Sequence, residues 1–267
     1  MTTIARACRR VLLTAEPGAK IKAARAAARA WRRGALAHLF DVAMPDRPAR
    51  PARPETLPPN RMPKRGKAGS ERSRIAMLHA LAHIEHGAID LAFDMAGRFG
   101  AAFPRAFVDD WIGVGADEAM HFALLDRRLQ ALGSCYGALP AHDGLWQAAA
   151  ATAHDPLARL AVVPMVLEAR GLDVTPALVA AFERAGDARS AAILTRIYRD
   201  EIRHVAAGTA WFRKLCESRA IAAVPEWQRL IRAHFRGAVK PPFNDSARDE
   251  AGLSREFYLG VAGVELD

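Results

Sequence analysis

The chain has 267 residues, of which 51% are hydrophobic, and it carries a net charge of +9. That length allows one large domain with an appendage, and the absence of any run of about 18 apolar residues excludes a membrane-spanning helix. Cys8, Cys135 and Cys216 are odd in number and far apart, which argues against a disulfide framework or a zinc site and predicts a reducing, cytoplasmic location.

The positive charge is concentrated at the N-terminus. Residues 1–74 hold 18 Lys and Arg against 5 Asp and Glu, whereas the rest of the chain holds 20 against 24. Two short helices are predicted at about 3–15 and 19–40, within a basic extension that spans residues 1–44. The positive electrostatic potential of this extension can steer an anionic partner, for example tRNA. The alternative is a solvated basic face, and no recognised nucleic-acid-binding motif is visible.

A Pro-rich segment follows at residues 45–70. Prolines recur at every third position from Pro45 to Pro54, and three more follow at Pro58, Pro59 and Pro63. This spacing predicts an extended, polyproline-like segment. It is either a linker or a strap laid over the helices that follow.

Four amphipathic helices are predicted in residues 71–217, because apolar residues recur there at steps of three and four. They are expected at about 73–96, 104–133, 156–171 and 187–216. We expect them to form an all-α four-helix bundle, with a C-terminal helix and tail at 218–267 packed on it.

Two further signals concern the ends of these helices. Asp187 is a suitable N-cap for the fourth helix. The third helix is expected to stop near Gly171, because Pro176 would start a new helix. That interruption would provide an opening for a substrate or dioxygen.

One constellation of residues, a lone Glu followed later by Asp-Glu-x-x-His, occurs twice with an offset of 83 residues. The copies are Glu85, Asp117, Glu118, His121 and Glu168, Asp200, Glu201, His204. On helices the Glu and His side chains face inward among apolar neighbours. A buried carboxylate is costly unless it is paired or binds a metal. Carboxylates with one imidazole per copy suit iron or manganese, and a lone Glu plus Glu-x-x-His is the ligand pattern of ferritin-like bundles.

The alternative for any single Glu is a salt bridge at a helix edge, with Arg170 or Arg203 as the partner. The repetition favours a two-metal site. Asp117 and Asp200 are placed to accept the second ring N–H of the ligand histidines, although solvated helix acids remain an alternative. Arg203 and Tyr198 are predicted to lie beside the metals, Tyr198 as a hydrogen-bond donor or redox residue, with a packed bundle tyrosine as its alternative.

A second polar stripe lies on the first long helix. His79, His83, His86 and Asp90 share one face, which is about 120° from Glu85 around the helix, so they cannot bind the same metal. We expect them to hydrogen-bond to neighbouring helices or to the Pro-rich strap. A separate metal site is the alternative.

The C-terminal tail also carries polar residues after its last clear helix. Phe243, Asn244 and Arg248 are predicted to fold back as a lid or a substrate clamp. His142, in the loop after the first helix pair, is predicted to close one end of the bundle.

The chain resembles an uncharacterised ferritin-like family called domain of unknown function 455, over roughly residues 10–260. The segments that carry the resemblance are 79–85, 109–122, 140–146, 167–176, 200–205 and 241–244. The resemblance implies a ferritin-like fold with six metal ligands, Glu85, Glu118, His121, Glu168, Glu201 and His204, and it implies no particular activity. Asp-Glu-x-Arg-His at 200–204 also resembles bacterial multicomponent monooxygenases and ribonucleotide reductase-like proteins, whereas the first copy has Met120 where that motif has Arg.

The leading interpretation is therefore a di-iron oxidoreductase that activates dioxygen to hydroxylate or oxidise an organic substrate, with a reductase as its electron donor. Manganese is the alternative metal. One alternative function is ferroxidase-like handling of iron or peroxide. Another is a non-catalytic binding bundle that the metals only stabilise.

Overall fold

The computed structural model describes residues 2–63, 66 and 68–263. In that part of the chain every regular element is a helix, which confirms the predicted all-α class. The chain divides into two compact units, residues 1–146 and 147–267. None of the described helices is long and apolar enough to cross a bilayer.

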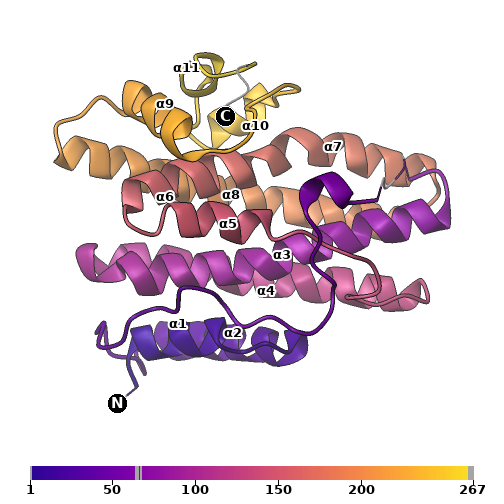
Figure 1. Cartoon of the computed structure of the whole chain (residues 1–267), viewed down its shortest axis with the longest axis horizontal. Helices are drawn as coiled ribbons and strands as arrows, with labels where there is room; N and C mark the ends of the chain where they lie inside the picture. The colour runs from indigo at the N-terminus through magenta and orange to yellow at the C-terminus, as the bar shows by residue number, and fades with distance from the viewer. Residues whose placement is uncertain (1, 64–65, 67, 264–267) are drawn as a thin grey trace. The chain divides into compact units, whose positions relative to one another are not determined.

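Two long helices form the centre of unit 1. Helix α3 (Glu71–Phe99) turns through the short helix η2 (Gly100–Ala102) and folds back as α4 (Arg105–Ala131), so that the two lie along each other (Figure 1). Gly115 lets them approach closely, because a Cβ there would lie 2.6 Å from Cε2 of Phe93.

The basic N-terminal extension packs on this pair. Helix α1 (Ile4–Leu12) lies against α3, and α2 (Pro17–Arg32) lies against α4. The second predicted helix was too long, because Gly34 takes a φ of 69° just after α2 and ends it.

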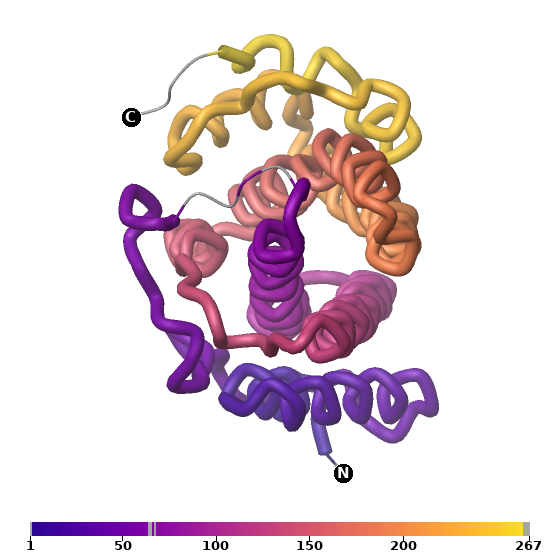
Figure 2. Tube along the Cα trace, turned by 90° about the vertical axis from the view of Figure 1, so that its right-hand side faces the viewer, coloured from indigo at the N-terminus to yellow at the C-terminus, as the bar shows by residue number. Residues whose placement is uncertain are grey.

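The Pro-rich segment is held by hydrogen bonds within unit 1. Arg98 donates through Nη2 to the carbonyl of Pro45 at 2.8 Å, and Trp146 donates through Nε1 to the carbonyl of Asp46 at 3.2 Å. Further along, the backbone N–H of Leu57 donates to Ala141 at 2.8 Å. Figure 2 shows the segment as a continuous tube that runs from the end of α2 to the short helix η1 (Pro59–Arg61). These are the contacts of a strap.

Unit 2 contains the second long pair. The start of α5 (Gly144–Ala151) belongs to unit 1 and its end to unit 2; α6 (Pro156–Val162), the π-helical turn η3 (Val163–Glu168) and α7 (Ala169–Arg184) follow. Helix α8 (Ala188–Ser218) folds back along α7, and the Asp187 side chain accepts from Ser190 N at 3.0 Å, as an N-cap should. Three helices complete the unit (Figure 1): α9 (Ala223–His234), α10 (Asp245–Glu250) and α11 (Arg255–Leu259).

The prediction that the third helix ends near Gly171 is wrong. Helix α7 runs through both Gly171 and Pro176. A proline leaves the carbonyl four residues earlier without its helical donor. Here that carbonyl belongs to Leu172, and the side-chain amide of Asn244 donates to it at 3.1 Å. The C-terminal tail thus supplies the hydrogen bond that Pro176 removes.

The irregularity lies one turn earlier, in η3. Pro164 has no N–H, and its ring would press on the carbonyl four residues before it in a regular α-helix. The wider π-turn relieves this conflict. Helix α8 makes room for the ring at Gly208, where a Cβ would lie only 2.3 Å from Cβ of Pro164.

Candidate metal centre

Unit 1 brings the first copy of the ligand pattern together. Glu85 comes from α3, and Glu118 and His121 lie one turn apart on α4; all three are buried. His121 Nδ1 lies 3.4 Å from Glu85 Oε2 and 3.3 Å from Glu118 Oε2. One ligand atom from each of the three lies within 4.8 Å of the others. This buried cluster of Glu and His could hold a metal ion.

The electrostatics of the cluster fit a cation. Burial raises the pKa of Glu85 well above its usual range, and the negative charge of Glu118 raises it further. Burial alone would lower the pKa of His121, but hydrogen bonds and charge from Glu118 and Glu85 outweigh it and raise that pKa to about 11. The raised pKa values mean that Glu85 and His121 take up protons, which offset the negative charge of the buried carboxylates. A bound divalent cation would offset the same charge. Carboxylate oxygens with one imidazole are a donor set that iron and manganese accept.

Unit 2 carries the second copy on two adjoining elements. Glu201 and His204 lie one turn apart on α8, both buried, with His204 Nδ1 3.5 Å from Glu201 Oε1. Glu168 is the last residue of the π-turn η3, which packs against α8. Unit 2 thus places a lone Glu on a π-turn next to the helix that bears its Glu-x-x-His.

The residues predicted beside the metals make other contacts. Asp200 accepts from Arg196 Nε at 2.6 Å and also from Arg203, whose side chain is 64% exposed. The hydroxyl of Tyr198 accepts from the side chain of Asn244 at 2.9 Å. Asp117 is half-buried on α4. The roles assigned to Asp117 and Asp200 toward the histidines stay predictions.

Two histidines of the polar stripe on α3 bond the loop between α4 and α5, whereas neighbouring helices or the strap were predicted as their partners. His79 Nε2 accepts from the backbone N–H of Gly137 at 3.0 Å. His83 bonds the hydroxyl of Tyr136 at 2.9 Å and the carbonyl of His142 at 3.2 Å.

The fourth member of the stripe, Asp90, has a counterpart that the sequence reasoning missed. Fully buried Asp90 accepts from Lys20 of α2, also fully buried, and from Arg50 of the strap. Asp173 is likewise buried, and Arg248 of α10 donates to it through Nε at 2.8 Å and Nη2 at 2.7 Å. Each Asp stands five residues after its lone Glu, so the offset of 83 that joins the ligands also joins these two residues. Extending the comparison of the copies by five residues would have found the pair.

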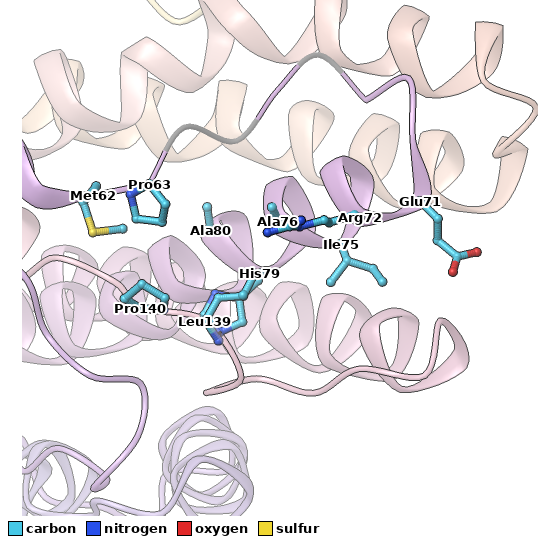
Figure 3. Close-up of a pocket in the computed structure, with 10 residues that line it drawn as sticks. All are labelled: Met62, Pro63, Glu71, Arg72, Ile75, Ala76, His79, Ala80, Leu139 and Pro140. Carbon is cyan, nitrogen blue, oxygen red and sulfur yellow. Dashed lines mark hydrogen bonds between the residues drawn. The ribbon is translucent and has the colours of Figure 1, made fainter.

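The ligand residues do not line the large cavity near the start of α3. That cavity has a volume of about 360 Å³, and Figure 3 shows Met62, Ile75, His79 and Pro140 among the residues around it. Its walls are mostly apolar, and none of the predicted ligands is among them. It is a feature separate from the buried Glu/His cluster.

Fold and site together define an all-helical protein with a buried Glu/His cluster that could hold a metal ion. Comparison with known proteins places it further. Residues 13–259 match the family described as "Protein of unknown function (DUF455)", and the chain belongs to that family. An uncharacterized protein of Haemophilus influenzae is 41% identical over 221 residues, which are 80% of this chain and 76% of that protein. No solved structure matches.

Proposed function

We propose that the two ligand sets form one di-iron centre inside a ferritin-like four-helix bundle, and that the protein is a dioxygen-activating oxidoreductase. The observation that carries the proposal is the buried cluster of Glu85, Glu118 and His121. Its ligand pattern recurs at an offset of 83 residues in the second unit.

The helix pairs support this arrangement. Each unit has a long helix hairpin, α3 with α4 and α7 with α8. In each case the lone Glu precedes or lies on the first member and Glu-x-x-His lies on the second. A ferritin-like centre takes its ligands from four helices in this manner. The proposed ligands are Glu85, Glu118, His121, Glu168, Glu201 and His204.

The chain's own residues would hold and shield the metals. Four carboxylates and two imidazoles provide the hard donors that iron prefers, and Glu85, Glu118 and His121 are themselves buried, so the unit 1 ligands would be shielded from water. Bound iron would supply the electrons for the reduction of dioxygen. Because the protein contains no other redox group in this proposal, a separate reductase would return those electrons between turnovers.

The test begins with protein purified without added metal and loaded anaerobically with ferrous iron. We expect about two irons per chain and consumption of dioxygen on exposure to air, as two-metal chemistry requires. The variant carrying both Glu118→Gln and Glu201→Gln should bind less iron and consume less dioxygen. A protein that binds neither iron nor manganese would refute the metal centre. Metal binding without any reaction with dioxygen would refute the oxidoreductase and leave a structural metal site.

Iron storage and ferroxidase activity make a different prediction. A ferroxidase consumes dioxygen with ferrous iron alone and deposits ferric iron in amounts far above two per chain. A ratio that stays near two on repeated loading favours the oxidoreductase, because its metals are resident cofactors.

A further inference from the structure

Unit 2 contains a cavity of about 160 Å³ between the π-turn and the C-terminal tail. The π-turn contributes Met165, Val166 and Leu167, and the tail contributes Phe235 and Phe243. This is the volume of about five water molecules at about 30 Å³ each. A small organic molecule fits such a space, and a macromolecular segment does not.

The charged residues around the cavity are mostly basic. Arg170, Lys240 and Arg248 line it together with a single acid, Asp173. Arg248 is 3% exposed and donates two hydrogen bonds to Asp173, so this one pair neutralises the acid. The charges of Arg170 and Lys240 are left in excess. The cavity therefore favours an anion.

Both arginines keep donors available. Arg248 donates to Asp173 through Nε and Nη2, and Nη1 has no hydrogen-bond partner among the residues that the structure describes. The hydrogen bonds of Arg170 in the same part of the chain all leave from Nη1, to Asp173, Lys240 and Pro242. Its Nε and Nη2 groups are thus unused. Arg248 is buried, whereas the Arg170 side chain is 36% exposed, so the N–H groups of Arg170 that bond no protein atom are open to solvent and to a ligand. A guanidinium with such donors can bind a carboxylate through paired hydrogen bonds.

We propose that this cavity binds a small organic carboxylate. Its carboxylate oxygens would accept from Arg170 and Arg248, and its short apolar or aromatic body would pack on Phe235, Phe243 and the π-turn. The apolar wall favours an organic body over a bare inorganic anion, because a naked phosphate would leave that wall without a partner.

The position of the cavity connects it to the metal ligands. Leu167 of its wall is followed directly by Glu168, so the wall and a proposed ligand share one turn of helix. If the proposed function holds, the carboxylate is the substrate, and its apolar body lies beside the turn that bears Glu168. That assignment rests on the proposed function, whereas the binding of the anion does not.

Unit 1 lacks a basic residue at the position equivalent to Arg170, so the basic cavity does not belong to the repeated pattern. An offset of 83 places Gly87 where unit 2 has Arg170. A Cβ at Gly87 would lie 3.3 Å from Cδ1 of Leu145, so an apolar side chain occupies the space next to that position. The basic cavity is a property of unit 2 alone in this comparison.

Isothermal titration of the metal-free, full-length protein tests the binding site. The probes are benzoate and the straight-chain carboxylates from acetate to hexanoate, with benzamide as the uncharged match for benzoate. At least one carboxylate should bind, and benzamide should bind at least about tenfold more weakly than benzoate, because it cannot make the charge-assisted bonds. Arg170→Gln should lower the affinity for the carboxylate that binds best by about tenfold or more.

Arg189→Gln is the matched control, because Arg189 is exposed on α8 and does not line the cavity. It should bind the carboxylate as the unchanged protein does. The absence of binding for every probe, or equal binding of benzoate and benzamide, would overturn the proposal. An equal loss in Arg170→Gln and Arg189→Gln would do so as well.

The iron-loaded protein separates this proposal from the proposed function. Arg170→Gln should keep its full iron content while the carboxylate that binds best no longer alters the rate of dioxygen consumption. Carboxylate binding by a protein that takes up no metal would leave the site standing and remove the di-iron function. Dioxygen consumption that no carboxylate changes would remove the substrate assignment and leave the di-iron function.

Discussion

The two units carry the same ligand pattern on helices that are built differently. Four residues before each lone Glu, unit 1 has Leu81 and unit 2 has Pro164; four residues after each ligand His, unit 1 has Leu125 and unit 2 has Gly208. A π-turn that contains Pro164, whose ring Gly208 accommodates, leads to the second lone Glu, whereas α3 passes through the first as a regular helix. The duplicated residues are the proposed ligands, and their neighbours, which differ, give only unit 2 the π-turn that lines the cavity of about 160 Å³.

The same contrast holds for the buried acids. Asp90 anchors the N-terminal helix α2 and the strap through Lys20 and Arg50, and Asp173 anchors the C-terminal helix α10 through Arg248. The acid is part of the repeat, but the cation comes from a segment that is not repeated. Each unit has therefore attached its own terminal segment at the position five residues after its lone Glu.

The largest effect is expected at the unit 1 anchor. Asp90→Asn should lower the free energy of unfolding by about 3–5 kcal/mol, because it leaves the fully buried Lys20 without its anion. Urea denaturation followed by circular dichroism measures the change. Glu226→Gln is the control; Glu226 pairs with Arg229, whose side chain is 62% exposed, so its loss should cost less than about 1 kcal/mol. Equal effects of the two changes would show that Asp90 is not a buried anchor.

Removal of one ligand should have the next largest effect. Glu118→Gln should weaken iron binding by about 100-fold or more, since removing a ligand costs at least as much as removing the group that supports one. Competition with a chelator measures the affinity. Glu183→Gln, an exposed acid on α7, should leave it unchanged.

The metal-free form of the same variant tests the electrostatics of the cluster. Without the charge of Glu118, the pKa of Glu85 should fall toward its ordinary range, because that charge is one of the causes that raise it. The pKa of His121 should fall as well, because the variant loses the negative charge that lies 3.3 Å from Nδ1. NMR titration of the metal-free protein measures both, and an unchanged Glu85 pKa would show that burial alone raises it.

The π-turn offers a smaller, local test of the difference between the units. Gly208→Ala should cost about 1–3 kcal/mol, because its Cβ would meet Pro164 at 2.3 Å and one of the two must move. Gly171→Ala has nothing within 4 Å and should instead stabilise α7 by up to about 1 kcal/mol. Thermal unfolding of both variants checks the pair. If Gly208→Ala left the stability unchanged, the packing of Pro164 against α8 would not require a glycine at position 208.

The features that could be predicted from the sequence are those that leave a periodic or a repeated pattern in it. The long helices and the six ligand positions follow from apolar spacing and an offset of 83, since both signals lie within short windows. The course of the third helix could not be predicted in the same way. Gly171 and Pro176 are local signals for a helix end, but the hydrogen bond that overrides them comes from Asn244, 72 residues after Leu172. The pairing of Lys20 with Asp90 is equally long-range, and no local pattern specifies it.

The smallest effect is expected for Arg203, which the sequence placed beside the metals. Its guanidinium bonds Asp200, but its side chain is 64% exposed, and Arg196 Nε also holds Asp200 at 2.6 Å. Arg203→Gln should therefore change the free energy of unfolding by less than about 1 kcal/mol, and the iron affinity should stay the same. Denaturation and chelator competition on one preparation measure both. A loss of iron affinity with unchanged stability would show that the charge of Arg203 acts at the centre, and that unit 2 tunes its ligands through exposed residues as well as through the π-turn.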